Sequence, residues 1–170
     1  LAEAGKDQLS SPLSVGAIFT IGPYLLPKFI PHLQEKAAKM PLYVEEGYTQ
    51  NLRKKLRNGE LDVIIVALPF EEPDVVTQVL YEEPFVVLMP KTHPWAEREA
   101  IDPMDLQTEQ LLLLGEGHCF RDQVLTTCPN INNPGDAMGA SNVRTAAEGS
   151  SLETLRHMVA SGLGLTILPA

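Results

Sequence analysis

The chain has 170 residues, of which 44% are hydrophobic, so it can bury a sizeable core as one domain or as two small lobes. Its formal net charge of −9 at pH 7 argues against a surface that grips a nucleic-acid phosphate backbone, which requires clustered Lys and Arg. No apolar run approaches the roughly 18 residues that span a bilayer, and no basic-then-apolar leader opens the chain, so we expect a cytoplasmic protein without a membrane partner.

The first half of the chain alternates between strand-like apolar runs and segments with helical spacing. We expect strands at 13–19, 42–46 and 61–68, the last fully buried, and helices at 23–39 and 50–58. Pro27 and Pro31 should kink the first helix or delay its start, and Gly59 should close the second. This β-α-β-α-β run predicts a parallel sheet with ligands at its carboxyl edge, where Thr20 and Thr49 fall.

A polar break at 71–74 separates this run from the second half of the chain. There we expect strands at 75–81, 85–89, 110–114 and 165–168, a helix at 151–160, and an exposed Asn/Gly/Pro-rich loop at 129–140. The predicted organisation is a linker remnant at 1–12, a first lobe at 13–78, a second lobe at 79–149, and a return to the first lobe at 150–170. The cleft between two such lobes is the default binding site.

Both cysteines of the chain lie close together, at 119 and 128. Cys119 is flanked by His118 and followed by Arg121, and either side chain is a candidate to favour a thiolate, the reactive form of cysteine. This pattern is typical of a thiol sensor, with Cys119 as the attacking group.

The residues between the cysteines predict a short helix, because 120–127 contains neither proline nor glycine. An intact helix would separate the two sulfurs by roughly 13 Å and place them on opposite faces. A disulfide needs Cα atoms within about 7 Å, so joining Cys119 to Cys128 would require the helix to unravel or relocate. The alternative is that both are ordinary buried cysteines, which is the usual state of two thiols in an intracellular domain.

Four sequence blocks closely resemble the regulatory domain of LysR-type transcriptional regulators, and they occur in the same order. They are IGPYLLP at 21–27, HPW at 93–95, GHCFRDQ at 117–123 and SLETLRHMVASGLGLTILP at 151–169. The first and last blocks are typical of the family's effector domains in general. GHCFRDQ with a second cysteine nine residues after the first is specific to the family's peroxide-sensing members.

The resemblance implies a fold and a chemistry. The fold is α/β, with two Rossmann-like lobes of the periplasmic-binding-protein type joined by two crossover strands. Cys119 would attack hydrogen peroxide to give a sulfenic acid, and Cys128 would condense with it to form a disulfide. The peroxide pocket would be shaped by Thr20, Thr49, His118, Arg121 and Asp122.

The resemblance also implies partners. The chain would form a homodimer, and a tetramer in the full protein, and would meet DNA through an N-terminal helix-turn-helix domain outside this chain. RNA polymerase and a reductant of the glutaredoxin or thioredoxin type are expected as further partners. No cofactor and no metal are expected, because the cysteines and His118 lack the close-paired spacing of a zinc site.

Each pocket residue has a structural interpretation beside the functional one. Thr20 and Thr49 precede predicted helices, and from the residues alone we favour ordinary N-caps for both. His118 can be a packed histidine, and Arg121 with Asp122 can form a solvated surface pair.

Two other functions remain open from the sequence. A regulator of the same fold could bind a small organic effector in the cleft, with incidental cysteines. A thiol peroxidase could use the same two cysteines for repeated turnover with an external reductant.

Overall fold

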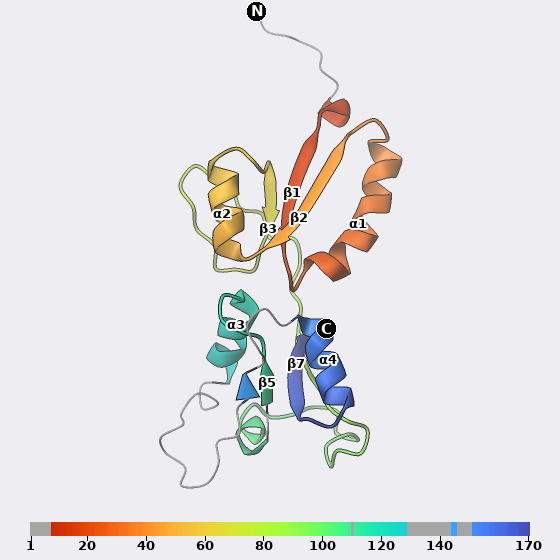
Figure 1. The fold of residues 1–170 in the computed structure, drawn as a ribbon, viewed down its shortest axis with the longest axis vertical. Helices are drawn as coiled ribbons and strands as arrows, with labels where there is room; N and C mark the ends of the chain where they lie inside the picture. The colour runs from red at the N-terminus through yellow and green to blue at the C-terminus, as the bar shows by residue number, and fades with distance from the viewer. Residues whose placement is uncertain (1–7, 110, 129–143, 146–150) are drawn as a thin grey trace, which may run out of the picture. The chain divides into compact units, whose positions relative to one another are not determined.

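The computed structural model describes residues 8–109, 111–128, 144–145 and 151–170. The expected linker remnant lies mostly outside the described residues, and the loop expected at 129–140 lies wholly outside them. The chain divides into two compact units, residues 1–72 and 73–170 (Figure 1).

The first unit contains a three-stranded parallel sheet, as the sequence predicted. Its strands are β1 (Leu13–Ile18), β2 (Leu42–Gly47) and β3 (Val63–Ile65), in the order β2-β1-β3. Ile18 pairs in register with Gly47, so β1 and β2 end side by side. β3 is shorter and more exposed than the buried strand expected at 61–68, because it forms an edge of the sheet and pairs with one strand only among the described residues.

Two helices connect these strands: α1 (Gly22–Lys36) and α2 (Thr49–Arg57). The expected delay in α1 is wrong, because the helix begins at Gly22 and runs through Pro27 and Pro31. Both prolines lie on the exposed side of the helix, where water can bind the carbonyl groups that lose their N–H partners. α2 ends as predicted, with Gly59 at a φ of +71° after the C-cap.

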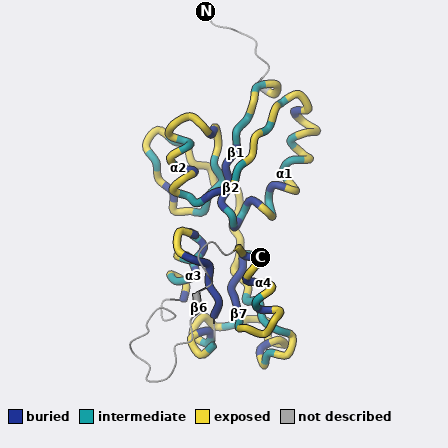
Figure 2. The backbone as a smooth tube through the Cα atoms, viewed as in Figure 1, coloured by how far each residue is buried: buried dark blue, intermediate teal, exposed yellow. Residues whose placement is uncertain are grey.

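The second unit contains a four-stranded mixed sheet in the order β4-β7-β5-β6. Its strands are β4 (Phe85–Leu88), β5 (Leu111–Leu113), β6 (Arg144–Thr145) and β7 (Leu165–Pro169). β7 is antiparallel to β4 and parallel to β5. β5 and β7 are buried almost throughout, and in Figure 2 the dark blue of buried residues follows them.

The last twenty residues belong to the second unit, against our expectation that 150–170 returns to the first lobe. The reason is strand pairing, since β7 is hydrogen-bonded between β4 and β5. The unit boundary falls after Glu72, six residues before the expected end of the first lobe at 78. Residues 75–81 form no strand, and the described residues pass between the units only at this boundary, so the expected second crossover is not among them.

α4 (Leu152–Ala160) covers β7 and completes the core of the second unit. Its N-cap is Ser151, whose Oγ accepts a hydrogen bond from the N–H of Thr154 at 3.2 Å. The buried side chains recur at helical spacing, at Leu152, Leu155 and Val159. None of the described helices combines the length and apolar character needed to cross a membrane.

We predict that Leu155→Ala lowers the free energy of unfolding of the second unit by about 2–5 kcal/mol, because it leaves a cavity at a side chain that is 1% exposed. Leu163→Ala is the matched control, since Leu163 is 42% exposed, and it should cost less than about 1 kcal/mol. Urea titration followed by fluorescence of Trp95, the chain's one tryptophan, reports on this unit. Equal losses in the two variants would contradict the assigned core.

Candidate functional site

The cysteine segment forms the helix predicted for it, α3 (Cys119–Thr127). Phe120, Val124 and Cys128 recur every four residues and are all buried, so they form one apolar face. The ring of Phe120 packs edge-on against the ring of Phe85 in β4, with the centroids 5.2 Å apart. Packing of this face therefore holds a helix of only nine residues, which would be marginal by itself.

The two thiols occupy opposite ends of α3, and both are free. Cys119 is the first helical residue and is partly exposed. Cys128 is the C-cap, and its N–H donates to the carbonyl oxygen of Val124 at 2.9 Å. At the standard rise per residue, nine residues place the two Cα atoms roughly 13 Å apart, well beyond the reach of a disulfide.

The loop between β5 and α3 is held at both ends by Arg121. Its Nη1 donates to the carbonyl oxygen of Leu114 at 2.9 Å, and its backbone N–H donates to the carbonyl oxygen of His118 at 3.0 Å. Gly117 lies between them with a φ of +91°, a conformation that favours glycine. Arg121 thus fixes the position at which the chain turns into Cys119.

His118 is the N-cap of α3, and its side chain is buried beside the first turn. Burial lowers the pKa of His118 from its ordinary value, because the positive imidazolium is disfavoured away from water. The side chain is therefore neutral near pH 7 and offers hydrogen bonding next to Cys119 rather than a positive charge.

Burial shifts the pKa of the Cys128 thiol in the opposite direction to that of His118. It raises the pKa of Cys128, because the negative thiolate is disfavoured in an apolar surrounding. Cys128 consequently stays protonated and unreactive while it remains packed on the face of α3.

Asp122 is exposed in the first turn of α3. The alternative of a surface ion pair between Arg121 and Asp122 is not realised among the described residues, because the guanidinium turns toward Leu114 instead. The Asp122 carbonyl accepts a hydrogen bond from Thr126 Oγ1 at 2.8 Å.

Thr20 and Thr49 lie at the carboxyl edge of the first sheet, as predicted. Each follows its strand by two residues, and those strands end in register at Ile18 and Gly47. The preferred N-cap interpretation is wrong for both, because the N-caps of α1 and α2 are Ile21 and Tyr48. Thr20 is 5% exposed, and the buried Thr49 Oγ1 has no hydrogen-bond partner within the described structure.

The structure thus gathers five of the seven expected site residues on one short helix and its two caps. These are His118, Cys119, Arg121, Asp122 and Cys128, all in the second unit. Thr20 and Thr49 form a separate pair in the first unit. Among the described residues, no three His, Cys, Asp or Glu side chains are grouped as metal ligands.

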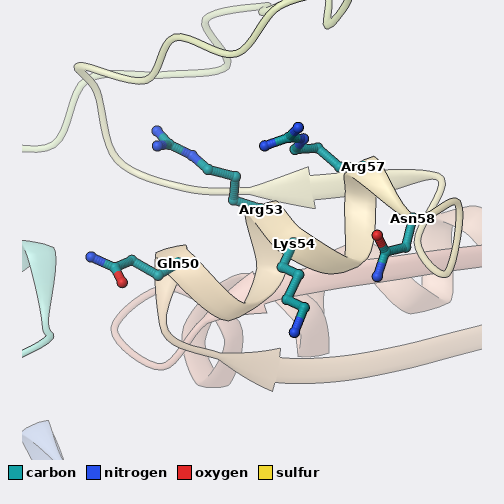
Figure 3. A pocket seen from close by; sticks show the side chains of 5 residues that line it. All are labelled: Gln50, Arg53, Lys54, Arg57 and Asn58. Carbon is teal, nitrogen blue, oxygen red and sulfur yellow. The ribbon is translucent and has the colours of Figure 1, made fainter.

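A basic cavity on α2 was missed by the sequence analysis. It has a volume of about 470 Å³ and is lined by Gln50, Arg53, Lys54, Arg57 and Asn58 (Figure 3). The available signal was local charge, because α2 carries basic residues in its last turn within a chain of net charge −9.

Comparison with known sequences gives a family. The family model described as the LysR substrate binding domain matches residues 6–170. The DNA-binding transcriptional dual regulator OxyR of Escherichia coli K12 is 40% identical over 170 residues, which cover 100% of this chain and 53% of that protein. The chain therefore spans about half the length of the curated relatives it matches.

Comparison with solved structures also finds members of this family. The reduced OxyR regulatory domain of Pseudomonas aeruginosa has a TM-score of 0.84 and 59% identity, over 95% of this chain and 74% of that one. A structure of the oxidized form of OxyR has a TM-score of 0.76 and 42% identity, over 95% of this chain and 73% of that one. These likenesses confirm the expected α/β fold of the periplasmic-binding-protein type. The chain belongs to the LysR substrate-binding domain family.

Proposed function

We propose that this chain is the sensor part of a transcriptional regulator that detects hydrogen peroxide through Cys119 and Cys128. The observation that carries the proposal is the placement of a partly exposed thiol and a buried thiol at opposite ends of one short helix. The names of the relatives support it, since several are hydrogen peroxide-inducible genes activators. Two incidental cysteines would not need this division into an accessible and a protected group.

The first chemical step takes place at the start of α3. The thiolate of Cys119 attacks one oxygen of hydrogen peroxide, the O–O bond breaks, and hydroxide leaves, giving Cys119 sulfenic acid. The N-terminus of a helix favours a negative charge by about 0.3–1 kcal/mol, and Cys119 is the first residue of α3. The departing hydroxide takes up a proton, and neutral His118, which precedes Cys119 in the chain, is a candidate to donate a hydrogen bond to it.

The second step couples chemistry to shape. The Cys128 thiol displaces the hydroxyl group of the sulfenic acid, so that a disulfide forms and water is released. Because the intact helix holds the cysteines roughly 13 Å apart, Cys128 must leave the apolar face and α3 must unwind. The oxidised helix segment is then a second state, stabilised by a covalent bond.

The remaining site residues have supporting roles in this proposal. Arg121 positions the turn that carries Cys119, and exposed Asp122 lies on the same first turn. Thr20 and Thr49, which belong to the first unit, remain candidates for hydroxyl groups that bind peroxide. The buried Thr49 Oγ1 supports this role, because a buried hydroxyl without a partner is costly unless a ligand or water binds it.

For the whole protein, we infer a homodimer that becomes a tetramer and binds DNA through a helix-turn-helix domain outside this chain. The change in α3 would alter the arrangement of subunits and so activate transcription with RNA polymerase. A glutaredoxin- or thioredoxin-type reductant would restore the thiols. The protein would act in the cytoplasm and respond once per oxidation, as a sensor rather than as an enzyme.

We expect the reduced chain to form an intramolecular Cys119–Cys128 disulfide after about one equivalent of hydrogen peroxide, because one peroxide oxidises one thiol pair. Intact mass and peptide mapping check this. Cys119→Ser should abolish the reaction, whereas Cys128→Ser should stop at the sulfenic acid, which dimedone traps.

Three outcomes would refute the proposal in different ways. Unmodified thiols would direct attention to a small organic effector. A peroxide response that survives Cys119→Ser would make the cysteines incidental. Sustained peroxide consumption by substoichiometric protein with a thiol reductant would indicate a thiol peroxidase.

Hydrogen exchange should distinguish the two states at α3. We expect amides from Arg121 to Cys128 to lose protection by about tenfold or more on oxidation, because the helix must open. Amides of α4, which shares the unit but carries no cysteine, should change little and provide the internal control. Equal exchange across 121–128 in both forms would contradict the coupling of oxidation to shape.

Alkylation with iodoacetamide should separate the two thiols before oxidation. We expect Cys128 to react at least about tenfold more slowly than Cys119 near neutral pH, because burial blocks access and its raised pKa lowers the thiolate fraction at any given pH. Strong urea should remove the difference. Rapid labelling of native Cys128 at pH 7 would show that it is not held on the apolar face of α3.

A further inference from the structure

α2 is positively charged, whereas the chain as a whole is negatively charged. Arg53, Lys54, Lys55 and Arg57 fall within nine residues that contain no Asp or Glu, although the whole chain carries a net charge of −9. Cations in a last turn stabilise a helix through its dipole, but that effect requires no particular side-chain arrangement. The contacts of the two arginines show a definite arrangement.

One buried carboxylate lies within ion-pair distance of both guanidinium groups. Glu72 has a side chain only 7% exposed, and its two oxygens pair with Arg53 Nε at 3.2 Å and with Arg57 Nε at 3.3 Å. Arg53 also lies over the ring of Phe70, 4.9 Å from its centroid, and its Nη2 reaches the carbonyl oxygen of Glu71 at 3.4 Å. Both ion pairs therefore use the inner nitrogen of the guanidinium.

This arrangement leaves the outer nitrogens of Arg57 available. Its side chain is 67% exposed, and within the described residues its Nη atoms make no recorded bond. Lys54 is exposed beside it and has no recorded ion pair in the same part of the chain. The lining residues thus carry two guanidinium groups and one ammonium group but no carboxylate, and Glu72 pairs with both guanidinium groups.

The lining residues form a stripe along α2 and do not surround a single point. Gln50, Arg53, Lys54, Arg57 and Asn58 recur at helical spacing along a cavity of about 470 Å³. In Figure 3 the arginines extend to one side of α2, and Lys54 and Asn58 extend to the other. Eight residues of helix span about 12 Å, so the donors do not converge on one small anion. An elongated ligand with several negative groups fits this stripe.

We propose that this stripe on α2 is a docking surface for an acidic segment of a partner protein. Carboxylates pair well with the fork of outer nitrogens that Glu72 leaves exposed on Arg57. Glutamates spaced four residues apart on a partner helix would follow the spacing of the lining residues. This interaction is independent of Cys119 and Cys128.

Duplex nucleic acid fits less well. The stripe is bordered by the carboxylates of Glu45 and Glu60, which accept hydrogen bonds from Lys55 and Asn58. A duplex is wider than the stripe and would bring its phosphates against these carboxylates, in a chain of net charge −9. A narrow peptide can contact the stripe and avoid them.

The test is titration calorimetry of the 170-residue chain with a helical synthetic peptide carrying Glu at every fourth position. Binding should be saturable at low salt and should weaken by about fivefold or more when the salt concentration rises from 0.05 M to 0.3 M. A peptide with Gln in place of each Glu should not bind. A duplex oligonucleotide is titrated in parallel and should also fail to bind.

Matched charge changes locate the site. Lys54→Glu and Arg57→Gln should each weaken peptide binding, Lys54→Glu by about fivefold or more. Lys39→Glu and Lys39→Gln introduce the same changes at an exposed lysine outside the stripe and should leave binding within about twofold. Lys54 takes part in no recorded ion pair in the described structure, so Lys54→Glu should fold normally, which thermal unfolding checks.

The effect of Glu72→Gln on peptide affinity distinguishes two roles of Glu72. The carboxylate either orients the arginines or only reduces the positive charge of the stripe. Removing this carboxylate raises the local charge, so a purely electrostatic surface would bind the peptide more tightly. If Glu72 orients the arginines, Glu72→Gln weakens binding despite the added charge. Tighter binding by this variant, binding of the Gln peptide, preference for the duplex, or equal losses at Lys39 and Lys54 would each overturn the proposal.

Discussion

The burial of Cys128 is the constraint on which the arrangement of the site depends. With Phe120 and Val124 it completes the apolar face that attaches α3 to the second unit, and it is only 4% exposed. The same burial keeps the thiol protonated and out of reach. Packing and reactivity are therefore coupled at this one side chain, because any reaction that needs Cys128 must first remove it from the core.

Apolar packing and hydrogen bonds together hold α3. Phe120 and Cys128 are buried at its two ends, Arg121 adds hydrogen bonds to Leu114 and His118 in the first turn, and the N–H of Cys128 donates to the carbonyl oxygen of Val124 in the last. A nine-residue helix has little stability without such contacts. In the proposed reaction Cys128 leaves the apolar face, and the packing that it gives to the last turn is lost. The basic stripe on α2 belongs to the other unit and involves none of these groups.

Local sequence patterns predicted the helices and strands themselves better than they predicted how deeply each one is buried. The parallel direction of β1, β2 and β3 followed from alternating strand and helix periods, and the helix after Cys119 followed from the absence of breakers. The exposure of β3 did not follow, because an apolar run looks the same at an edge and in the centre of a sheet. Prolines on the exposed side of α1 likewise left the helix unbroken, for reasons that only their surroundings supply.

The sequence by itself determined where the two cysteines of the proposed redox pair lie in the chain. The spacing of Cys119 and Cys128 and the residues between them are covalent facts, and they already imply opposite ends of one helix. The tertiary structure decided which thiol is buried, that His118 is neutral, and that Arg121 turns to a backbone carbonyl rather than to Asp122. It also assigned β7 to the second sheet and brought Glu72 to the arginines of α2. These outcomes depend on contacts between residues distant in sequence, which local periodicity does not encode.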